Sequence, residues 1–372
     1  MTEKDTVPRK KACNHCSKAK VRCDLKKPKC TRCKNRNISC EYVYARGVDD
    51  PSSVAPTIIQ KTIPFINDSS CPPETLDFDN VSLIRTLDDD RIRARWLETV
   101  LPSPEHTPKL YQASTMAFLA SIMRSWPGIF LFNEALPPFI HWTQVAVTVP
   151  VSLSSCMTLS RTWKTQTPGS ESMVCSVIEQ EMRKLIEQQV DCNHMELLAT
   201  VQSYLLYAIM LYFTPRSGSN YIEQDTMIKL QALTADLASK GTLCWAEAHG
   251  TRPGWESWIV ASARRRTMFA AYLFDNLVNF NLGSPSYIAT ELASIPAPGS
   301  KRLWDATTRQ SWNAAYNQQL SQWSDGELLI SDLWPHNEPP SDSLKRKIDQ
   351  WLSSVDEFGM MLYSVTSHTY NH

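Results

Sequence analysis

The chain has 372 residues, of which 42% are hydrophobic and 20% are charged. This composition is typical of a globular protein and excludes a chain that is disordered throughout. The longest apolar run, YLLYAIMLYF at 204–213, is half of the roughly 20 residues that a membrane-spanning helix needs, so we expect no membrane partner. The first residues, MTEKDTVPRKK, are polar and basic, so we expect no signal peptide.

The formal net charge is zero, with 38 Lys+Arg and 38 Asp+Glu, but the two signs are divided along the chain. Residues 1–46 hold 14 basic and 4 acidic residues, a net charge of +10, which leaves −10 for the remainder. A small basic segment on an acidic chain indicates that the N-terminal part contacts a polyanion.

Six cysteines fall within the stretch CNHCSKAKVRCDLKKPKCTRCKNRNISC at 13–40, and their spacing is C-x2-C-x6-C written twice. They are Cys13, Cys16, Cys23, Cys30, Cys33 and Cys40. Without a secretory signal we expect a reducing compartment, which favours metal binding over disulfides. Zinc prefers four ligands in a tetrahedron and binds thiolates well. Six thiolates therefore hold either one zinc with two spare cysteines or two zincs with two bridging thiolates, and the symmetric repeat favours the second.

Basic residues surround these cysteines, and so short a segment has no apolar core of its own. We therefore expect metal binding to supply its folding free energy. The basic residues that lie near the negative charge of the thiolates are Lys18, Lys20, Arg22, Lys26, Lys27 and Lys29.

The segment resembles the binuclear zinc cluster of fungal DNA-binding regulators, cysteine for cysteine across residues 13–40. The resemblance implies two Zn(II) ions bridged by Cys13 and Cys30. The first ion would be held by Cys13, Cys16, Cys23 and Cys30, and the second by Cys30, Cys33, Cys40 and Cys13. It also implies a transcription factor that binds double-stranded DNA at RNA polymerase II promoters and acts in the nucleus. A basic run at 8–11, PRKK, is consistent with a nuclear import signal.

Each C-x2-C pair predicts a short helix, roughly at 14–20 and 31–37, that presents basic side chains to a major groove. Family members typically read CGG triplets with a basic residue four positions past the second cysteine, which implies Lys20 as the base contact. Lys18 and Arg22 are its basic neighbours, whereas Ser17 and Ala19 stand where the family usually has basic residues. The basic residues that we predict to contact phosphate are Lys26, Lys27, Lys29, Arg32, Lys34 and Arg36.

The departures at Ser17 and Ala19 leave an alternative open. In that alternative the zinc cluster is a protein-interaction module that binds co-regulators or the transcription machinery, and its DNA contact is incidental.

The chain divides into three predicted parts: a zinc-cluster DNA-binding domain at 1–46, a flexible linker at 47–80 and an all-α regulatory domain at 81–372. Five prolines between 51 and 73 exclude a continuous helix in the linker. No a/d heptad repeat lies between 41 and 80. We therefore expect a monomer on DNA or a dimer that pairs through the regulatory domain.

Helical periodicity dominates the regulatory domain. DDDRIRARWLETVLP, at 88–102, predicts a helix with Ile92, Trp96 and Val100 on one face. SVIEQEMRKLIEQQ, at 176–189, aligns its apolar residues beneath a charged face, and these are Ile178, Met182 and Leu185.

The next predicted helix begins at Asn193 as N-cap, with Glu196 three residues on, and ends at Pro215. It is apolar nearly all round, which predicts a central buried helix. Another helix stops at Gly241, and a long one runs over 255–280 until GSP at 283–285. This pattern predicts stacked antiparallel helices.

A second resemblance covers roughly 174–306, through WESWIVASARRRT, GSP, ELASIPAP and LWDA. These stretches are similar to the fungal-specific regulatory domain that follows zinc clusters, and more closely to regulators of secondary-metabolite gene clusters. Such relatives usually continue past this length, and this chain ends in a helical pattern, so it is either a short member or a truncated gene model.

No pattern in the regulatory domain indicates an enzyme. The eight histidines are scattered, with no H-E-x-x-H motif and no nucleophile elbow. We expect Arg264, Arg265 and Arg266 to have a structural or solvated role, because arginines on helices commonly pair with acids.

Overall fold

The structure is a computed structural model. It describes residues 12–26, 29–36, 38, 40, 75–102, 106–132, 135–146, 148–187, 193–214, 222–323, 326–335, 340–367 and 369–370. The chain forms two compact units, residues 1–61 and 62–372. We call their described parts the head (12–40) and the body (75–370). The predicted import signal at 8–11 and most of the predicted linker lie outside the described residues.

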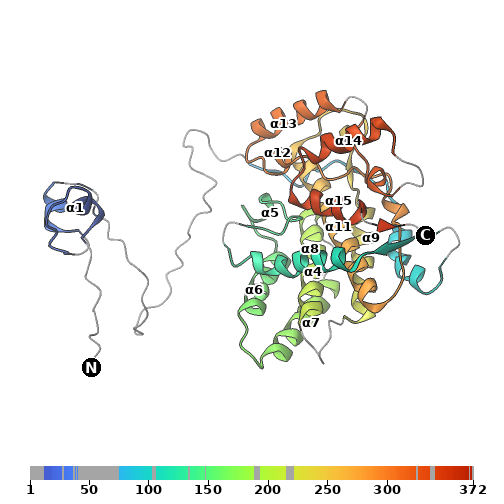
Figure 1. Cartoon of the computed structure of the whole chain (residues 1–372), viewed down its shortest axis with the longest axis horizontal. Helices are drawn as coiled ribbons and strands as arrows, with labels where there is room; N and C mark the ends of the chain where they lie inside the picture. Colours follow the sequence, from blue (N-terminus) through green and yellow to red (C-terminus); the bar gives the residue numbers. More distant parts are fainter. Residues whose placement is uncertain are drawn as a thin grey trace. The chain divides into compact units, whose positions relative to one another are not determined.

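The head contains two one-turn helices, α1 (Asn14–Lys18) and α2 (Thr31–Asn35) (Figure 1). Both are shorter than the sequence predicts, and α1 ends before Lys20, whose φ of 50° is left-handed. Among the described residues of the head, only four are buried, and all are cysteines: Cys13, Cys16, Cys30 and Cys33. The head therefore lacks an apolar core, as its composition predicts.

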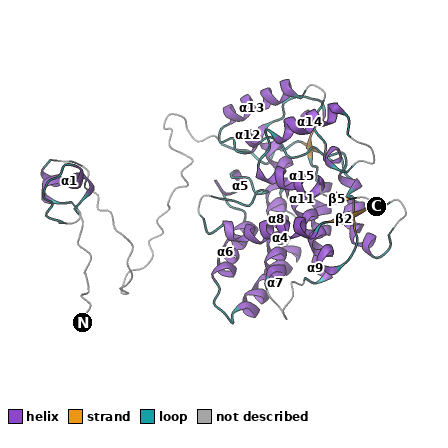
Figure 2. Cartoon of the chain, viewed as in Figure 1, coloured by secondary structure: helices purple, strands orange, loops and turns teal. Residues whose placement is uncertain are grey.

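The body is mainly helical, which confirms the predicted all-α class (Figure 2). Its helices in chain order are α3 (Asp89–Ala94), η1 (Arg95–Thr99), α4 (Ala113–Ile129), α5 (Thr143–Ala146), α6 (Val151–Thr165), α7 (Glu171–Glu187), α8 (His194–Phe213), α9 (Gln224–Ser239), α10 (Trp245–Ala248), α11 (Trp255–Leu282), η3 (Thr290–Leu292), α12 (Lys301–Trp304), α13 (Arg309–Gln322), η4 (Ile330–Leu333), α14 (Asp342–Leu352) and α15 (Glu357–Ser367).

Short strands join distant parts of the body. They are β1 (Leu83–Ile84), β2 (Pro108–Tyr111), β3 (Leu243–Cys244), β4 (Ser286–Tyr287) and β5 (Thr369–Tyr370). β1 pairs antiparallel with β3, and β2 lies between β4 and β5, also antiparallel. These strands contain two to four residues, too few to show the alternating pattern by which a strand is recognised in a sequence.

Helix α8 lies at the centre of the body and packs against α4, α6, α7, α9 and α11 (Figure 1). Every residue from Leu197 to Phe213 is buried, as its apolar sequence predicts. By length and composition alone α8 is long enough to cross a membrane, but 94% of its most apolar window is buried inside the body. Burial in the core accounts for its apolar sequence.

The N-terminus of α8 follows the sequence prediction in one feature and departs from it in another. Asn193 caps α8 as expected, with its side chain accepting from the N–H of Met195 and Glu196. Glu196 does not complete a capping box, because its carboxylate accepts from the backbone and hydroxyl of Ser152 at the start of α6. The predicted partner of the cap therefore joins two helices instead.

The helix predicted over 88–102 also changes its geometry. Ile92 is buried, but Val100 is 57% exposed and does not share its face. The α-helix α3 tightens at its end into the 3₁₀-helix η1, which places residues i and i+3 on one side. Arg95, three residues past Ile92, is therefore buried at 4% exposure.

Candidate metal centre and nucleic-acid interface

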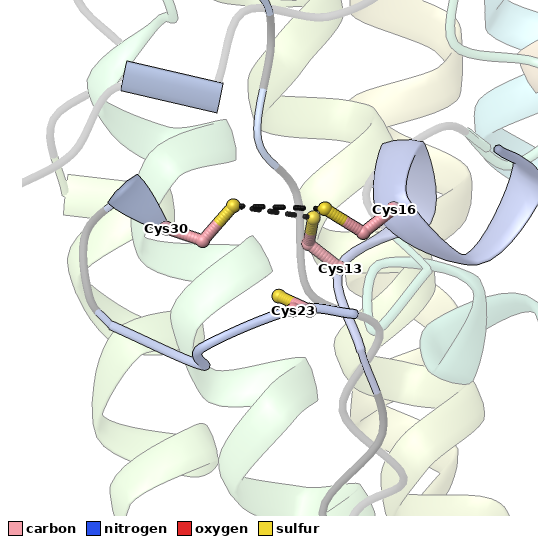
Figure 3. A group of neighbouring side chains, drawn as sticks. All are labelled: Cys13, Cys16, Cys23 and Cys30. Carbon is pink, nitrogen blue, oxygen red and sulfur yellow. Dashed lines mark hydrogen bonds between the residues drawn. The ribbon is translucent and has the colours of Figure 1, made fainter. Parts of the chain in front are cut away.

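The sulfur atoms of four cysteines of the head lie close together (Figure 3), and these are Cys13, Cys16, Cys23 and Cys30. Cys13 Sγ lies 3.9 Å from Cys30 Sγ and 3.8 Å from Cys33 Sγ, and Cys16 Sγ lies 3.8 Å from Cys30 Sγ. Four thiolates at about 2.3 Å from a tetrahedral zinc are separated by about 3.8 Å, so the observed spacing fits zinc.

The sulfur atoms form two groups of four, within which all sulfurs lie within 4.8 Å of one another. One group is Cys13, Cys16, Cys23 and Cys30, and the other is Cys13, Cys30, Cys33 and Cys40. The two groups have Cys13 and Cys30 in common. This is the arrangement needed for two tetrahedral ions to share two of six thiolates.

The sequence repeat folds into a repeated turn, which positions the sulfurs. The N–H of Val21 donates to the carbonyl of Cys16 at 3.0 Å, and the N–H of Ile38 donates to that of Cys33 at 3.1 Å. Such a bond over five residues reverses the chain after a helix when the preceding residue is left-handed. Lys20 is that residue in the first repeat. Its equivalent in the second repeat, Asn37, lies outside the described residues.

The thiols differ in acidity in a way that follows the repeat. A hydrogen bond from the backbone of Cys16 lowers the pKa of Cys13. In the same way, a hydrogen bond from the backbone of Cys33 lowers the pKa of Cys30. Burial raises the pKa of Cys16 to about 12 and also raises the pKa of Cys33. Such crowded thiols cannot all ionise without a cation, so zinc binding must release protons.

An acid that the sequence analysis did not single out organises the second helix. Asp24 accepts hydrogen bonds from the N–H of Thr31 at 3.2 Å and from its hydroxyl at 2.5 Å. The hydroxyl bond and the helix N-terminus stabilise the carboxylate, and the hydrogen bonds of Thr31 lower the pKa of Asp24. Asp24 is the single acid between residues 12 and 40, and its carboxylate binds the first residue of α2.

The predicted DNA-contacting residues mostly lie on the surface of the head. The exposed ones are Lys18, Lys20, Arg22, Lys26, Lys29, Lys34 and Arg36. Arg32 is half-buried, and its Nε has no hydrogen-bond partner within the described part of the chain. Lys27 lies outside the described residues. Lys18 ends α1 and Lys20 follows it in a left-handed turn, a conformation that no pattern in the sequence predicts.

The three consecutive arginines of the body, Arg264, Arg265 and Arg266, have exposures of 0%, 4% and 2%. Arg264 donates to the carbonyls of Lys240 and Gly241 at 2.7 Å, at the C-terminus of α9, where a cation is favoured. A side chain at Gly241 would meet Leu83 Cβ at 2.8 Å, so this close turn requires glycine.

The other two arginines point to different partners. Arg265 pairs with Glu247 at 3.1 Å, and Arg266 pairs with Asp356 at 2.6 Å. Because successive residues of a helix are turned by about 100°, three neighbours reach three different parts of the body. The structural role expected for these arginines is therefore observed, and burial removes them from any nucleic-acid surface.

Two family comparisons agree with this geometry. Residues 11–47 match the fungal Zn(2)-Cys(6) binuclear cluster domain, and residues 151–372 match the fungal specific transcription factor domain. The second match covers more than half of the chain, so the chain belongs to the family of fungal specific transcription factors. The cluster domain binds two zinc ions and DNA. Both domains are those of transcription factors and not of enzymes.

Two curated relatives are regulators of biosynthetic genes. A 72-residue stretch is 35% identical to the cercosporin biosynthesis regulatory protein CTB8 of Cercospora nicotianae and covers 19% of this chain and 18% of that protein. A 47-residue stretch is 43% identical to the ergochrome gene cluster transcriptional regulator of Claviceps purpurea (strain 20.1). It covers 12% of this chain and 10% of that protein. The chain thus matches less than a fifth of either relative's length. No solved structure matches the chain.

Proposed function

We propose that this transcription factor reads CGG-like sites in double-stranded DNA and regulates a secondary-metabolite gene cluster from the nucleus. The observation that carries the DNA part is the surface around the end of α1. There Lys18, Lys20 and Arg22 are all exposed beside the sulfur cluster. The regulatory part is supported by the names of the two relatives.

The six cysteines hold the two ions in this proposal. Cys13 and Cys30 bridge them, which is supported by their membership of both sulfur groups. Cys16 and Cys23 complete the first tetrahedron, and Cys33 and Cys40 complete the second. The ions supply the cross-links that fix the two repeats against each other, because the head has only cysteines as buried residues among those described.

Lys20 makes the base contact. Its left-handed φ of 50° directs the chain away from the axis of α1, so that its side chain is displayed on a turn. Lysine donates to the O6 and N7 atoms of guanine in a major groove. Lys18 and Arg22 flank it, and Lys26, Lys27, Lys29, Arg32, Lys34 and Arg36 contact phosphates, which supply affinity and salt dependence.

The full zinc-loaded chain tests this proposal in a selection of bound sites from random DNA duplexes. We expect enrichment of CGG-like triplets. One triplet per site indicates a monomer, and two at fixed spacing indicate a dimer paired through the body. Equal retention of all duplexes would contradict specific reading and favour the protein-interaction alternative.

A pair of variants separates base-specific recognition from non-specific electrostatic binding to phosphate. Lys20→Gln should weaken binding to the selected site by about 1–3 kcal/mol and relax its base preference. Lys34→Gln, on the exposed side of α2, should weaken selected and unselected duplexes alike and reduce the salt dependence. Identical profiles for the two variants would contradict the role of Lys20.

A further inference from the structure

A cavity of about 380 Å³ lies in the body between η1, α9, α11 and β4. Its volume falls in the range of about 300–1,000 Å³ that is typical of small-molecule sites. Ile228, Val278 and Leu282 form apolar walls, and Trp96 and Tyr287 also line it. Neither family match assigns a ligand to this region.

One wall of the cavity gathers three carboxylates around one guanidinium. Burial raises the pKa of Glu98 and of Asp275, as expected for carboxylates whose charge is incompletely compensated. The guanidinium of Arg95 is the cation at the centre of three carboxylates: it lies 2.9 Å from Glu291, 3.5 Å from Glu98 and 3.7 Å from Asp275. A single guanidinium neutralises one of them. Lys109 lies near this group and donates to Asn276 at 3.1 Å, but burial lowers its pKa to about 7, so it is only partly charged at neutral pH.

Two of the three carboxylates face the cavity, and both lie farther from the guanidinium than Glu291 does. Glu98 and Asp275 line it, and their side chains keep exposures of 15% and 11%. Glu98 also lies 3.7 Å from the imidazole of His106, which supplies charge only when protonated. Glu291 is more deeply buried, at 1%, and does not line the cavity; its Oε1 accepts from Arg95 and from the hydroxyl of Tyr272 at 2.6 Å, and its Oε2 has no hydrogen-bond partner among the described residues.

A buried polar atom on the same wall lacks a partner. Gln231 is 8% exposed and lines the cavity, and its Nε2 donates to Asp275 Oδ1 at 3.1 Å. This fixes its carbonyl oxygen, Oε1, as an acceptor, and that atom has no hydrogen-bond partner within the described part of the chain. Leaving a buried acceptor without a donor is unfavourable, so the wall is suited to a group that donates hydrogen bonds.

We propose that this cavity binds a small hydrophobic amine. The ammonium group lies against Glu98 and Asp275 with the Gln231 carbonyl nearby, and Trp96 and Tyr287 add the favourable contact of an aromatic ring with a cation. The apolar part of the ligand covers Ile228, Val278 and Leu282. An anionic ligand of the same shape is repelled, and a neutral one loses the charge-assisted hydrogen bonds. This site is independent of the DNA-reading proposal.

Three indole compounds of similar shape distinguish these possibilities by isothermal titration calorimetry on the full zinc-loaded chain. Tryptamine carries an ammonium, tryptophol a hydroxyl and indole-3-propionate a carboxylate. We expect tryptamine to bind at least about tenfold more tightly than tryptophol, with no measurable binding of the carboxylate. Equal binding of the amine and the alcohol, or a preference for the carboxylate, would overturn the proposal.

Variants locate the site. Glu98→Gln should weaken tryptamine binding by about tenfold and leave tryptophol unchanged. Glu256→Gln is the matched control, because Glu256 is also paired with an arginine, has a similar side-chain exposure of 14% and does not line the cavity. Ile228→Trp fills the cavity without altering its charges and should abolish binding of both compounds. Tryptamine binding that survives Ile228→Trp, in a variant with an unchanged thermal unfolding midpoint, would place the amine elsewhere and refute the proposal.

Discussion

The head and the body use basic residues in opposite ways. In the head, lysines and arginines lie on the surface around a group of buried sulfurs, as Lys18 and Lys20 do beside Cys16. In the body, three consecutive arginines of α11 lie in the interior and hold the end of α9, the residues after β3 and the start of α15 in place. The same type of charge is therefore exposed in one unit, where we propose that it serves recognition, and structural in the other.

The difference follows from what stabilises each unit. The body has a large apolar core around α8 and α11, which limits access of water and makes each buried ion pair specific and costly to break. The head has too few apolar residues to bury a cation, so most of its described basic side chains lie on the surface while metal holds the backbone. Each prediction below perturbs one side of this comparison.

Zinc removal should have the largest effect, and only in the head. Structural zinc contributes about 10–16 kcal/mol to folding in small zinc domains. With a chelator, the amides of Val21 and Ile38, which donate to Cys16 and Cys33, should lose protection in hydrogen exchange measured by mass spectrometry. Amides of α8 should keep theirs. Protection of the head amides after complete loss of zinc would show that something other than metal holds the head.

Breaking one buried pair should affect only the body. Arg266→Met leaves the carboxylate of Asp356 buried without its cation, and we expect a loss of about 3–5 kcal/mol in the free energy of unfolding. Denaturation by urea, followed by circular dichroism, measures it. Arg266 also stacks on Trp304 at 4.0 Å, so methionine retains apolar contact and isolates the charge.

Two further variants make this measurement specific. Arg302→Met, at an exposed position of α12, should change the free energy of unfolding by less than about 0.5 kcal/mol. Asp356→Asn combined with Arg266→Met should recover part of the loss, because no uncompensated charge remains. If Arg302→Met were as destabilising as Arg266→Met, burial would not be what makes the arginines of α11 structural.

These two regions also differ in how well their sequences predict them. The cysteine spacing predicts a common metal site because its five intervals repeat a short pattern, and the family resemblance predicts the two sulfur groups that share Cys13 and Cys30. The apolar residues Ile178, Met182 and Leu185 of α7 are all buried as predicted, because a long amphipathic helix has one possible inner face.

The features that escaped prediction depend on tertiary contacts or on single residues. Arg95 is a charged residue in a polar stretch, and nothing nearby in the sequence shows that Glu291 and Asp275 will surround it. Glu196 has the spacing of a capping box but bonds to Ser152, 44 residues earlier. Periodicity cannot detect either contact, because both join separate helices or turns.

Acid should weaken the body through a buried histidine. His141 is fully buried, and its Nε2 donates to the carbonyl of Trp304 at 3.0 Å, which fixes the neutral tautomer. Burial lowers its pKa from 6.5 to about 3. The folded state therefore resists protonation that the unfolded state accepts, and stability present above pH 6.5 is lost as the pH falls toward 3.

The loss attributable to His141 at pH 5 should be about 2 kcal/mol relative to pH 7. His141→Gln retains an N–H donor for Trp304 and does not titrate, so its urea midpoint should depend less on pH between 7 and 5. The head should lose zinc in both proteins, because its thiolates protonate in acid. Equal pH dependence of the body in the two proteins would mean that His141 is not the group that titrates.

The smallest expected effect is on zinc affinity at Lys20. This residue has both a left-handed backbone conformation and a proposed base contact, and two substitutions separate the two roles. Lys20 has a left-handed φ of 50°, which disfavours residues with a Cβ by about 1–2 kcal/mol. Lys20→Ala and Lys20→Gly both remove the ammonium, so both should lose about 1–3 kcal/mol of affinity for the selected site. Glycine alone relieves the turn, so Lys20→Gly should hold zinc more tightly than Lys20→Ala in a competition with a chromogenic chelator. Equal zinc affinities would show that the turn after α1 carries no strain, and then recognition, not folding, would be the only role left for this position.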